Sequence, residues 1–407
     1  MSSSFLCLPS VKSFGYPEVP ELTPPQALSY RKFSSMPKPS SRKKPKPARR
    51  YANPKASSSA PSVPPASLAE YEVLAHQQFT RPAWEYINSG SADENTTRWN
   101  VEALTRMRLK PNVMVDVSKI DTRTKLFGHE MPHPILVAPT SSHFLAHCEG
   151  EIATARGAGA AGAIMIASTL SNCGIDEIFH AATQPVWFQL YADEDRGKTK
   201  SLIERAEAIG CQALCITTDL PWIYARNREA HIVHEVPKLP FPNINFTGGP
   251  ASTGLKTWGY RNLNWTDLEW VRSFCRLPIL LKGILNPDDA DRAAKAGASG
   301  IIVSNHGGRS LDTVPASIDA LPAVAEKIAG RIPILMDGGI RRGTDVLKAI
   351  ANGATAILLG RPILYGLGIG GAEGVQRVIE ILRTEFEAAM ALTGRTTIAA
   401  IDRSVLW

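Results

Sequence analysis

The stretch PILLKGILNPDDADRAAKAGASGIIVSN, residues 278–305, contains one complete unit of the fold. Its two ends, PILLKG at 278–283 and GIIVSN at 300–305, are short apolar runs that become polar only where they finish, as buried parallel strands do. Between them, PDDADRAAKAGA has helical composition and ends near a glycine, which is common at helix C-termini. The stretch therefore predicts a strand, a helix and a second strand parallel to the first.

The same pattern recurs on both sides of this unit. The other six apolar runs are PILVAP (134–139), AIMIAS (163–168), VWFQLY (186–191), ALCITTD (213–219), IPILMDG (332–338) and AILLGRP (356–362). Segments with helical spacing separate most of the runs. Eight strands that alternate with helices predict an α/β protein, a (β/α)8 TIM barrel.

Three segments fall outside this repeat. Residues 67–92 have helical composition with a turn at Ser89 and Gly90, and this N-terminal helical extension should cover one end of the barrel. Residues 224–263 are rich in Pro, Gly and Asn, and a long loop after a barrel strand is a candidate lid. GLGIGG (366–371) matches the dinucleotide-binding pattern G-x-G-x-x-G, but no further strand completes a βαβ unit, which argues against a Rossmann site.

The N-terminal segment differs from the rest of the 407-residue chain in charge. The formal net charge is +7, yet residues 1–60 alone hold eleven Lys or Arg and two Glu, so the remainder is slightly acidic. The Pro-, Ser- and Lys-rich composition predicts a disordered basic tail over residues 1–66, ahead of a barrel domain at 67–407. A transit peptide and a plain spacer both fit this tail, so we expect a cytoplasmic location with a mitochondrial one as the alternative.

Composition also argues against three classes of ligand. Nucleic-acid binding requires a basic patch on a folded domain, which the slightly acidic body does not favour. No stretch approaches the roughly 18 apolar residues of a membrane helix. The six cysteines have no metal-type spacing with histidine. We therefore expect no nucleic-acid, membrane or metal partner.

Polar residues stand where the predicted strands end, which is where barrel enzymes carry their catalytic groups. These strand ends carry several charged side chains, a combination that suits an anionic ligand better than a packed core. In SNHGGRSLDTVPA (304–316), Gly307 and Gly308 let the backbone turn so that His306 and Arg309 face one small volume, which suggests a base beside a carboxylate-binding arginine. The strand-end residues are Gln189, Tyr191, Asp219, Lys282, His306, Asp337 and Arg361.

The segments after the last two predicted strands suggest a phosphate site. DGGIRRG (337–343) and GRP (360–362) place backbone N–H groups, helix N-termini, Arg341 and Arg361 where barrels commonly hold a phosphate. A phosphorylated cofactor is the expected ligand.

Taken together, the chain resembles the FMN-dependent L-2-hydroxy acid oxidases and dehydrogenases, which include glycolate oxidase, lactate oxidase and lactate monooxygenase. The resemblance covers about residues 68 to 403. It implies FMN as cofactor, oxidation of a small L-2-hydroxy acid to the 2-oxo acid with O2 as acceptor, and a homotetramer or homo-octamer. Besides SNHGGRSLDTVPA, it rests on SGSADE (89–94), PILVAPTS (134–141), HCEGEIATARGAGAAG (147–162), FQLYADEDR (188–196), PILLKGI (278–284) and DGGIRRGTDVLKAIANGA followed by GRP.

The resemblance also implies roles for catalytic residues. His306 would take a proton from the substrate, and Asp219 would hydrogen-bond the imidazole and stabilise its charged form. Tyr191 would hydrogen-bond the reacting oxygen. Lys282 matches a lysine beside the flavin N1 and C2 carbonyl, where a fixed cation stabilises negative charge.

Binding residues follow from the resemblance in the same way. Tyr86, Arg226 and Arg309 match contacts to the substrate carboxylate. Arg228 remains an alternative to Arg226, and Tyr86 has the alternative of a core position. The cofactor residues implied are Ser168, Gln189, Thr217 and Lys282 at the ring, and Asp337, Gly339, Arg341, Gly360 and Arg361 at the ribityl chain and phosphate.

Two positions depart from the family pattern. Ser141 stands where relatives usually carry Ala or Gly against the flavin, so the reaction with oxygen stays open. Leu170 replaces a residue that is aromatic in glycolate oxidase, which predicts room for a substrate larger than glycolate. An oxidase is the first hypothesis. A lactate-type monooxygenase, a dehydrogenase with another acceptor, and an isomerase or a non-catalytic barrel that binds a phosphorylated ligand are the alternatives.

Overall fold

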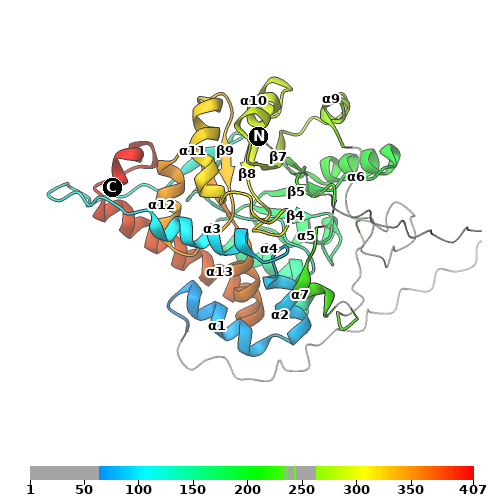
Figure 1. Ribbon diagram of the computed structural model, residues 1–407, viewed down its shortest axis with the longest axis horizontal. Helices are drawn as coiled ribbons and strands as arrows, with labels where there is room; N and C mark the ends of the chain where they lie inside the picture. Colours follow the sequence, from blue (N-terminus) through cyan, green and yellow to red (C-terminus); the bar gives the residue numbers. More distant parts are fainter. Residues whose placement is uncertain (1–63, 223, 233, 237–242, 244–262) are drawn as a thin grey trace, which may run out of the picture. The chain divides into compact units, whose positions relative to one another are not determined.

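The computed structural model describes residues 64–222, 224–232, 234–236, 243 and 263–407 (Figure 1). Eight strands of this part form a closed barrel in the order β10-β3-β4-β5-β6-β7-β8-β9. Every neighbouring pair in the barrel is parallel. The TIM-barrel prediction is therefore confirmed. Two predicted segments lie largely outside the described residues. They are the tail expected at 1–66, of which residues 1–63 are not described, and most of the lid expected at 224–263.

Each predicted apolar run contains one barrel strand. Most strands are shorter than their runs because the end residues leave the ladder, whereas β7 extends one residue further, to Ile284, across a register shift beside Gly283. The strands are β3 (Ile135–Val137), β4 (Met165–Ser168), β5 (Val186–Leu190), β6 (Leu214–Thr217), β7 (Ile279–Ile284), β8 (Gly300–Val303), β9 (Ile334–Met336) and β10 (Ala356–Leu359).

Helices follow the strands along the chain and surround the barrel (Figure 1). Their apolar faces and the outward-facing strand residues form the main hydrophobic core. These helices are α4 (Gly150–Ala160), α5 (Ile175–Ala181), α6 (Arg196–Ile209), α7 (Asn227–Ala230), α9 (Trp265–Arg272), α10 (Pro287–Lys295), α11 (Ser317–Ile328), α12 (Gly343–Ala351) and α13 (Arg361–Leu392). Three short 3-10 turns complete the described elements: η1 (His143–Leu145), η2 (Ile398–Ala400) and η3 (Arg403–Val405).

A hairpin that the sequence analysis did not predict packs onto the barrel interior. Strands β1 (Thr124–Leu126) and β2 (His129–Met131) pair antiparallel. Leu126 and Met131 are buried in one cluster with the inward-facing strand residues, and the Phe127 ring lies 5.5 Å from the ring of Trp187. The hairpin therefore extends the interior core.

The N-terminal helical extension lies at the opposite end of the barrel, its mouth. It consists of α1 (Leu68–Gln78), α2 (Arg81–Asn88) and a third helix, α3 (Asn95–Arg106), that was not predicted. Helix α2 packs against α7 (Figure 1). The backbone carbonyls of Ile87 and Ser89 accept hydrogen bonds from Arg361, the first residue of α13.

GLGIGG lies inside α13, as expected for a sequence that is not a Rossmann site. The helix is kinked at this point, where Gly370 and Gly371 leave helical backbone angles. No described helix is long and apolar enough to cross a membrane.

Candidate active site

The interior of the barrel changes from apolar to polar toward its mouth. Side chains alternate along a strand, so every second residue points inward. The lower inward positions hold apolar residues such as Ile166, Trp187 and Leu280, and the next inward position of each of these strands is polar and buried. This upper layer consists of Ser168, Gln189, Thr217, Lys282, Ser304 and Asp337.

His306 and Asp219 form a hydrogen-bonded pair above this layer. The imidazole Nδ1 lies 3.1 Å from Asp219 Oδ1, and His306 itself adopts a left-handed backbone conformation with φ of 59°. Asp219 packs directly against Gly283, where a Cβ would lie 2.4 Å from the Cβ of Asp219. The glycine therefore leaves the space that the Asp219 side chain occupies. An Nδ1–H that donates to Asp219 leaves the lone pair on Nε2, which is the tautomer a base requires.

Burial and charge set the protonation of this pair. Burial lowers the pKa of His306 below its ordinary range, and the Asp219 carboxylate offsets only part of that shift. Burial alone would raise the pKa of Asp219, but His306 and Lys282 outweigh it and the pKa is lowered. The pair is therefore a neutral imidazole beside an ionised carboxylate at neutral pH.

Lys282 is a buried cation with two partners. Its Nζ lies 3.2 Å from Asp337 Oδ2 and donates to Ser304 Oγ at 2.9 Å. Burial opposes its charge, but Asp337 and Asp219 more than compensate, so the pKa of Lys282 is raised. The other oxygen of Asp337 is buried with no hydrogen-bond partner among the described residues.

A hydrogen-bonded row crosses the ends of three adjacent strands. Ser168 Oγ donates to Gln189 Oε1 at 2.9 Å, and Gln189 Nε2 donates to Thr217 Oγ1 at 2.9 Å. Each residue comes from a different strand, β4, β5 and β6. Of the three, Ser168 lines the cavity at the mouth, while Gln189 and Thr217 stand beside it in the row.

Two tyrosines face the same cavity. The Tyr86 hydroxyl lies 2.9 Å from Ser141 Oγ, so this phenol reaches the mouth instead of the core, the alternative position considered for it. The Tyr191 hydroxyl lies 3.5 Å from His306 Nε2. Burial raises the pKa of Tyr191, so its hydroxyl keeps its proton and is available as a donor.

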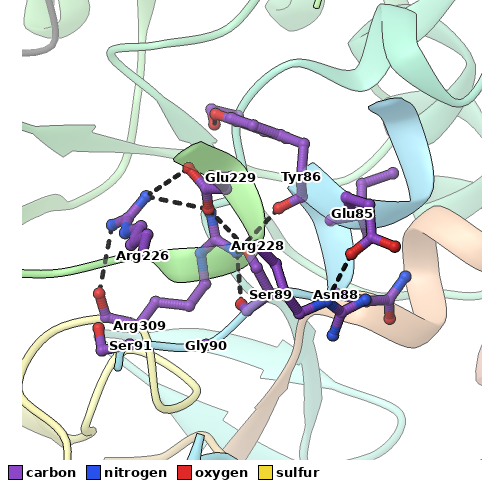
Figure 2. A network of polar contacts seen from close by, with 12 residues as sticks. Glu85, Tyr86, Asn88, Ser89, Gly90, Ser91, Arg226, Arg228, Glu229 and Arg309 are labelled. Atoms are coloured by element: carbon purple, nitrogen blue, oxygen red, sulfur yellow. Dashed lines mark hydrogen bonds and ion pairs between the residues drawn. The ribbon is translucent and has the colours of Figure 1, made fainter. Parts of the chain in front are cut away.

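The two predicted carboxylate-binding arginines lie together, and both contact Glu229 (Figure 2). Arg309 donates from Nη1 to the backbone carbonyls of Tyr86 and Ser89 at 2.8 and 2.7 Å, and from Nη2 to Glu229 at 2.8 Å. Arg226 Nη2 donates to the Arg309 carbonyl at 3.2 Å. The arginines are therefore held from several sides at the end of α2.

Arg228, the alternative to Arg226, takes a different place. Its guanidinium pairs with Glu85 of α2 (Figure 2) and with Glu94, the residue before α3. Arg226 contacts Arg309 instead, which favours Arg226 as the partner of Arg309.

The phosphate residues predicted from the sequence also line the cavity. Arg361 donates to three backbone carbonyls, and no described carboxylate pairs with it. Burial and the nearby Arg309 lower the pKa of Arg361 to about 10, so it stays charged at neutral pH and would be stabilised by an anion. Position 339 requires glycine, because a Cβ there would lie 2.1 Å from the backbone carbonyl oxygen of Asn100 in α3. Arg341 and Gly360 complete the group.

One cavity brings most of the predicted site residues together. Asp219 and Arg226 stand behind it in contact with His306 and Arg309, as Gln189 and Thr217 stand beside Ser168. The predicted residues that line the cavity are Tyr86, Ser168, Tyr191, Lys282, His306, Arg309, Asp337, Gly339, Arg341, Gly360 and Arg361.

Fold and site define a class of protein: a (β/α)8 barrel whose mouth holds several arginines beside a neutral histidine that is hydrogen-bonded to a carboxylate. Comparison with known proteins narrows this class. Residues 75–407 match the family model of FMN-dependent dehydrogenases. An L-lactate oxidase of Nostoc sp. is 43% identical over 357 residues, covering 84% of this chain and 98% of the relative.

Two further relatives agree. A peroxisomal (S)-2-hydroxy-acid oxidase of Oryza sativa subsp. japonica is 44% identical over 353 residues, 84% of this chain and 95% of that protein. The solved structure of a mandelate oxidase variant with (S)-mandelic acid has a TM-score of 0.78 at 35% identity, covering 84% and 98% of the two chains. The chain belongs to the FMN-dependent dehydrogenase family and is an FMN-dependent oxidoreductase that acts on CH–OH groups.

The residues present fit FMN. The buried oxygen of Asp337 that lacks a partner can accept a hydrogen bond from a ribityl hydroxyl, and Arg361, which has no described carboxylate partner, can bind a phosphate. Lys282 supplies a charged donor at the centre of the upper layer. The charge and hydrogen-bonding capacity of the cavity thus match the two polar ends of the cofactor.

Sequence reasoning missed two residues of this site. Ser304 Oγ accepts a hydrogen bond from Lys282 Nζ and another from the His306 backbone N–H at 3.0 Å. The sequence did offer a signal for Ser304, because it is the first residue of the motif SNHGG. Glu229 pairs with both arginines, and its only sequence signal is its spacing of three residues from Arg226.

Proposed function

We propose that the protein oxidises small L-2-hydroxy acids to 2-oxo acids and passes the two electrons to O2, forming hydrogen peroxide. The observation that carries the proposal is the His306–Asp219 pair, which presents a neutral Nε2 to a cavity lined by Arg309. The relatives named above are an L-lactate oxidase, an (S)-2-hydroxy-acid oxidase and a mandelate oxidase. The acids in these three names are all 2-hydroxy acids. A base beside a carboxylate-binding group is what this substrate class requires.

Each side chain has one task in the proposed reaction. The substrate carboxylate binds Arg309, Arg226 and the Tyr86 hydroxyl, which fixes the hydroxyl-bearing carbon against the cofactor ring. His306 Nε2 takes a proton from the substrate, and the ionised Asp219 stabilises the imidazolium that forms. The Tyr191 hydroxyl donates to the reacting oxygen. FMN, which Lys282, Asp337 and Arg361 would hold, would supply the acceptor for the two electrons and the second hydrogen that the substrate loses.

An anaerobic titration tests this function. Purified holoenzyme is mixed with glycolate, L-lactate, D-lactate and a longer L-2-hydroxy acid while the visible flavin absorbance is followed, and air is then admitted. We expect an L-acid to bleach the flavin, D-lactate to leave it unchanged, and air to restore the colour with one peroxide formed per 2-oxo acid. Flavin that no hydroxy acid bleaches would refute the proposed substrate class.

The same experiment separates the alternatives. Slow recovery in air, with fast recovery after an artificial acceptor, would indicate a dehydrogenase. Release of CO2 and acetate from L-lactate would indicate a monooxygenase. Ser141 lies beside Tyr86 in the cavity, and its effect on the reaction with oxygen stays a prediction that the recovery in air tests. Leu170 is absent from the described cavity lining, and room for a substrate larger than glycolate stays a prediction that the panel of acids tests.

The acid limb of the pH profile provides a first prediction. The base must be neutral to act, and burial holds the pKa of His306 below the 6.5 that is usual for histidine. Protonation therefore removes activity only below that pH. We expect kcat/KM to be flat through pH 7 and to fall below pH 6.5, where the substrate carboxylate is still ionised. A limb centred above pH 7 would contradict this assignment.

The variant Arg309→Lys provides a second prediction. Lysine cannot reproduce the contacts of the guanidinium with Tyr86, Ser89 and Glu229, nor a bidentate contact with a carboxylate. We expect KM to rise at least about tenfold, the loss of one charge-assisted hydrogen bond, with a smaller change in the rate at saturation. Steady-state kinetics check this, and an unchanged KM would remove Arg309 from substrate binding.

Assembly and location complete the proposal. We propose a homotetramer or homo-octamer, which light scattering coupled to size-exclusion chromatography tests directly. A cytoplasmic or mitochondrial location remains the expectation from the composition of the tail, whereas the Oryza relative is named peroxisomal. Fluorescent fusion of the full chain, with and without residues 1–60, distinguishes these compartments.

A further inference from the structure

Glu229 is a largely buried carboxylate that pairs with both Arg226 and Arg309 (Figure 2). Its side chain is 12% exposed, and it lies on α7, a short helix between the fourth and fifth barrel strands. Oε1 accepts from Ser89 Oγ at 2.5 Å and from Arg309 Nη2 at 2.8 Å, and Arg226 Nη1 lies 3.4 Å from both carboxylate oxygens. Burial alone would raise the pKa of Glu229, but the two arginines outweigh it and the pKa is lowered. The carboxylate is therefore charged at neutral pH.

The two arginines depend on Glu229 to different degrees. Arg309 is also held by backbone carbonyls of Tyr86 and Ser89. Arg226 has fewer contacts among the described residues: Nη1 pairs with Glu229, Nη2 donates to the Arg309 carbonyl at 3.2 Å, and Nε is buried without a partner. Arg226 is the more weakly held of the two, and Glu229 is its only described counter-ion.

Charge repulsion makes this dependence stronger. Arg226 and Arg309 are close enough that, after burial, Arg309 is the largest charge lowering the pKa of Arg226. Two neighbouring cations that are each only 16% exposed repel each other and separate without a counter-ion. A long side chain that leaves the site must be ordered again whenever substrate binds. With Glu229 the trio keeps a net charge of +1, which one substrate carboxylate neutralises.

We propose that Glu229 is a positioning residue of the substrate site: it holds Arg226 and Arg309 in the arrangement that receives one carboxylate. The proposal deepens the function proposed above and rests on it for the identity of the substrate. Of the three residues, Arg309 lines the described cavity, while Glu229 and Arg226 lie behind it, and Glu229 pairs with both arginines. Glu229 therefore acts through its contacts with the arginines.

The test compares Glu229→Gln and Glu229→Asp with a matched control, Glu85→Gln. Glu85 belongs to the same polar network but pairs with Arg228 and touches neither Arg226 nor Arg309 (Figure 2). Steady-state KM and kcat are measured on each holoenzyme with the L-2-hydroxy acid that reduces the unaltered protein best. Binding of oxalate, an unreactive carboxylate, is measured by calorimetry on the oxidised holoenzymes, and bound FMN is quantified.

We expect Glu229→Gln to raise both KM and the oxalate Kd at least about tenfold, while kcat changes less than about threefold and FMN content stays normal. Glu229→Asp keeps the charge and should stay within about threefold of the unaltered protein, as should Glu85→Gln. Unchanged oxalate binding in Glu229→Gln would overturn the proposal. So would tighter binding, because it would mean that Glu229 competes with the ligand.

Two other outcomes also have defined consequences: an unaltered protein without activity, and a Glu229→Gln variant that does not fold. If the unaltered protein oxidises no hydroxy acid, the proposed function fails, yet the oxalate comparison still decides the role of Glu229. If Glu229→Gln does not fold, Ser89→Ala replaces it. Without changing charge, it removes the hydrogen bond that Ser89 Oγ donates to Glu229 and also the one that it accepts from Arg309 Nη1 at 3.0 Å. A rise of about threefold in oxalate Kd would support positioning, and no rise would overturn it.

Discussion

Replacing His306 by alanine should slow substrate oxidation at least about a hundredfold while the protein still binds FMN. The variant removes Nε2, the basic atom that the contact between Nδ1 and Asp219 leaves facing the cavity. General-base catalysis contributes at least about a hundredfold to rate, so flavin reduction should slow by at least that factor. Stopped-flow mixing with an L-2-hydroxy acid under anaerobic conditions measures the rate directly.

A second histidine variant controls for general damage to the fold. His147 lies outside the described cavity lining, and His147→Ala should reduce flavin at the normal rate. FMN content should be equal in both variants because no predicted cofactor contact involves either imidazole. Near-normal flavin reduction in His306→Ala would refute its assignment as the base.

Replacing Lys282 by methionine should weaken both the fold and cofactor binding. Methionine leaves Asp337 as a buried carboxylate without its cation, and breaking a buried pair costs about 3–5 kcal/mol of the free energy of unfolding. Loss of a charged hydrogen-bond donor to the cofactor costs about 1.5–3 kcal/mol more. We therefore expect the FMN Kd to rise about tenfold to a hundredfold. Denaturant unfolding of the apoprotein and FMN fluorescence titration measure the two effects separately.

Lys348 provides the matched control for this variant. It is a buried lysine on α12 whose Nζ donates to the Leu104 carbonyl at 2.8 Å and lies 3.7 Å from Asp345. Lys348→Met should also lower the free energy of unfolding but leave the FMN Kd unchanged, because Lys348 is absent from the described cavity lining. An FMN Kd that is normal in Lys282→Met, or raised equally in both variants, would contradict a role for Lys282 at the cofactor.

The barrel could be predicted because its physics is local. A strand buried on both faces needs an unbroken apolar run, and eight such runs separated by helical segments leave few other folds. The strand-end polar residues could be predicted for the same reason, since their position follows from the end of each run. The strand ends brought His306, Lys282 and Asp337 to one mouth as expected.

Features without a local signal were missed. Helix α3 begins after Glu94, which has a φ of 60° and makes no capping hydrogen bond with its side chain. The sequence therefore holds no capping signal from which the start of α3 could be predicted. Hairpin β1–β2 has only three residues in each strand, too few to show alternation. Glu229 gains its role from arginines and a serine that lie 3, 80 and 140 residues away along the chain. Such a role exists only after the chain has folded.

The left-handed backbone at His306 sets stability against function at a single position. A side chain with a Cβ pays roughly 1–2 kcal/mol to adopt this conformation, whereas glycine adopts it freely, as the next two residues do. A population of variants selected only for heat resistance should therefore drift toward glycine at position 306. One selected for turnover should retain histidine there, so the residue found at this position records which pressure has acted on the lineage.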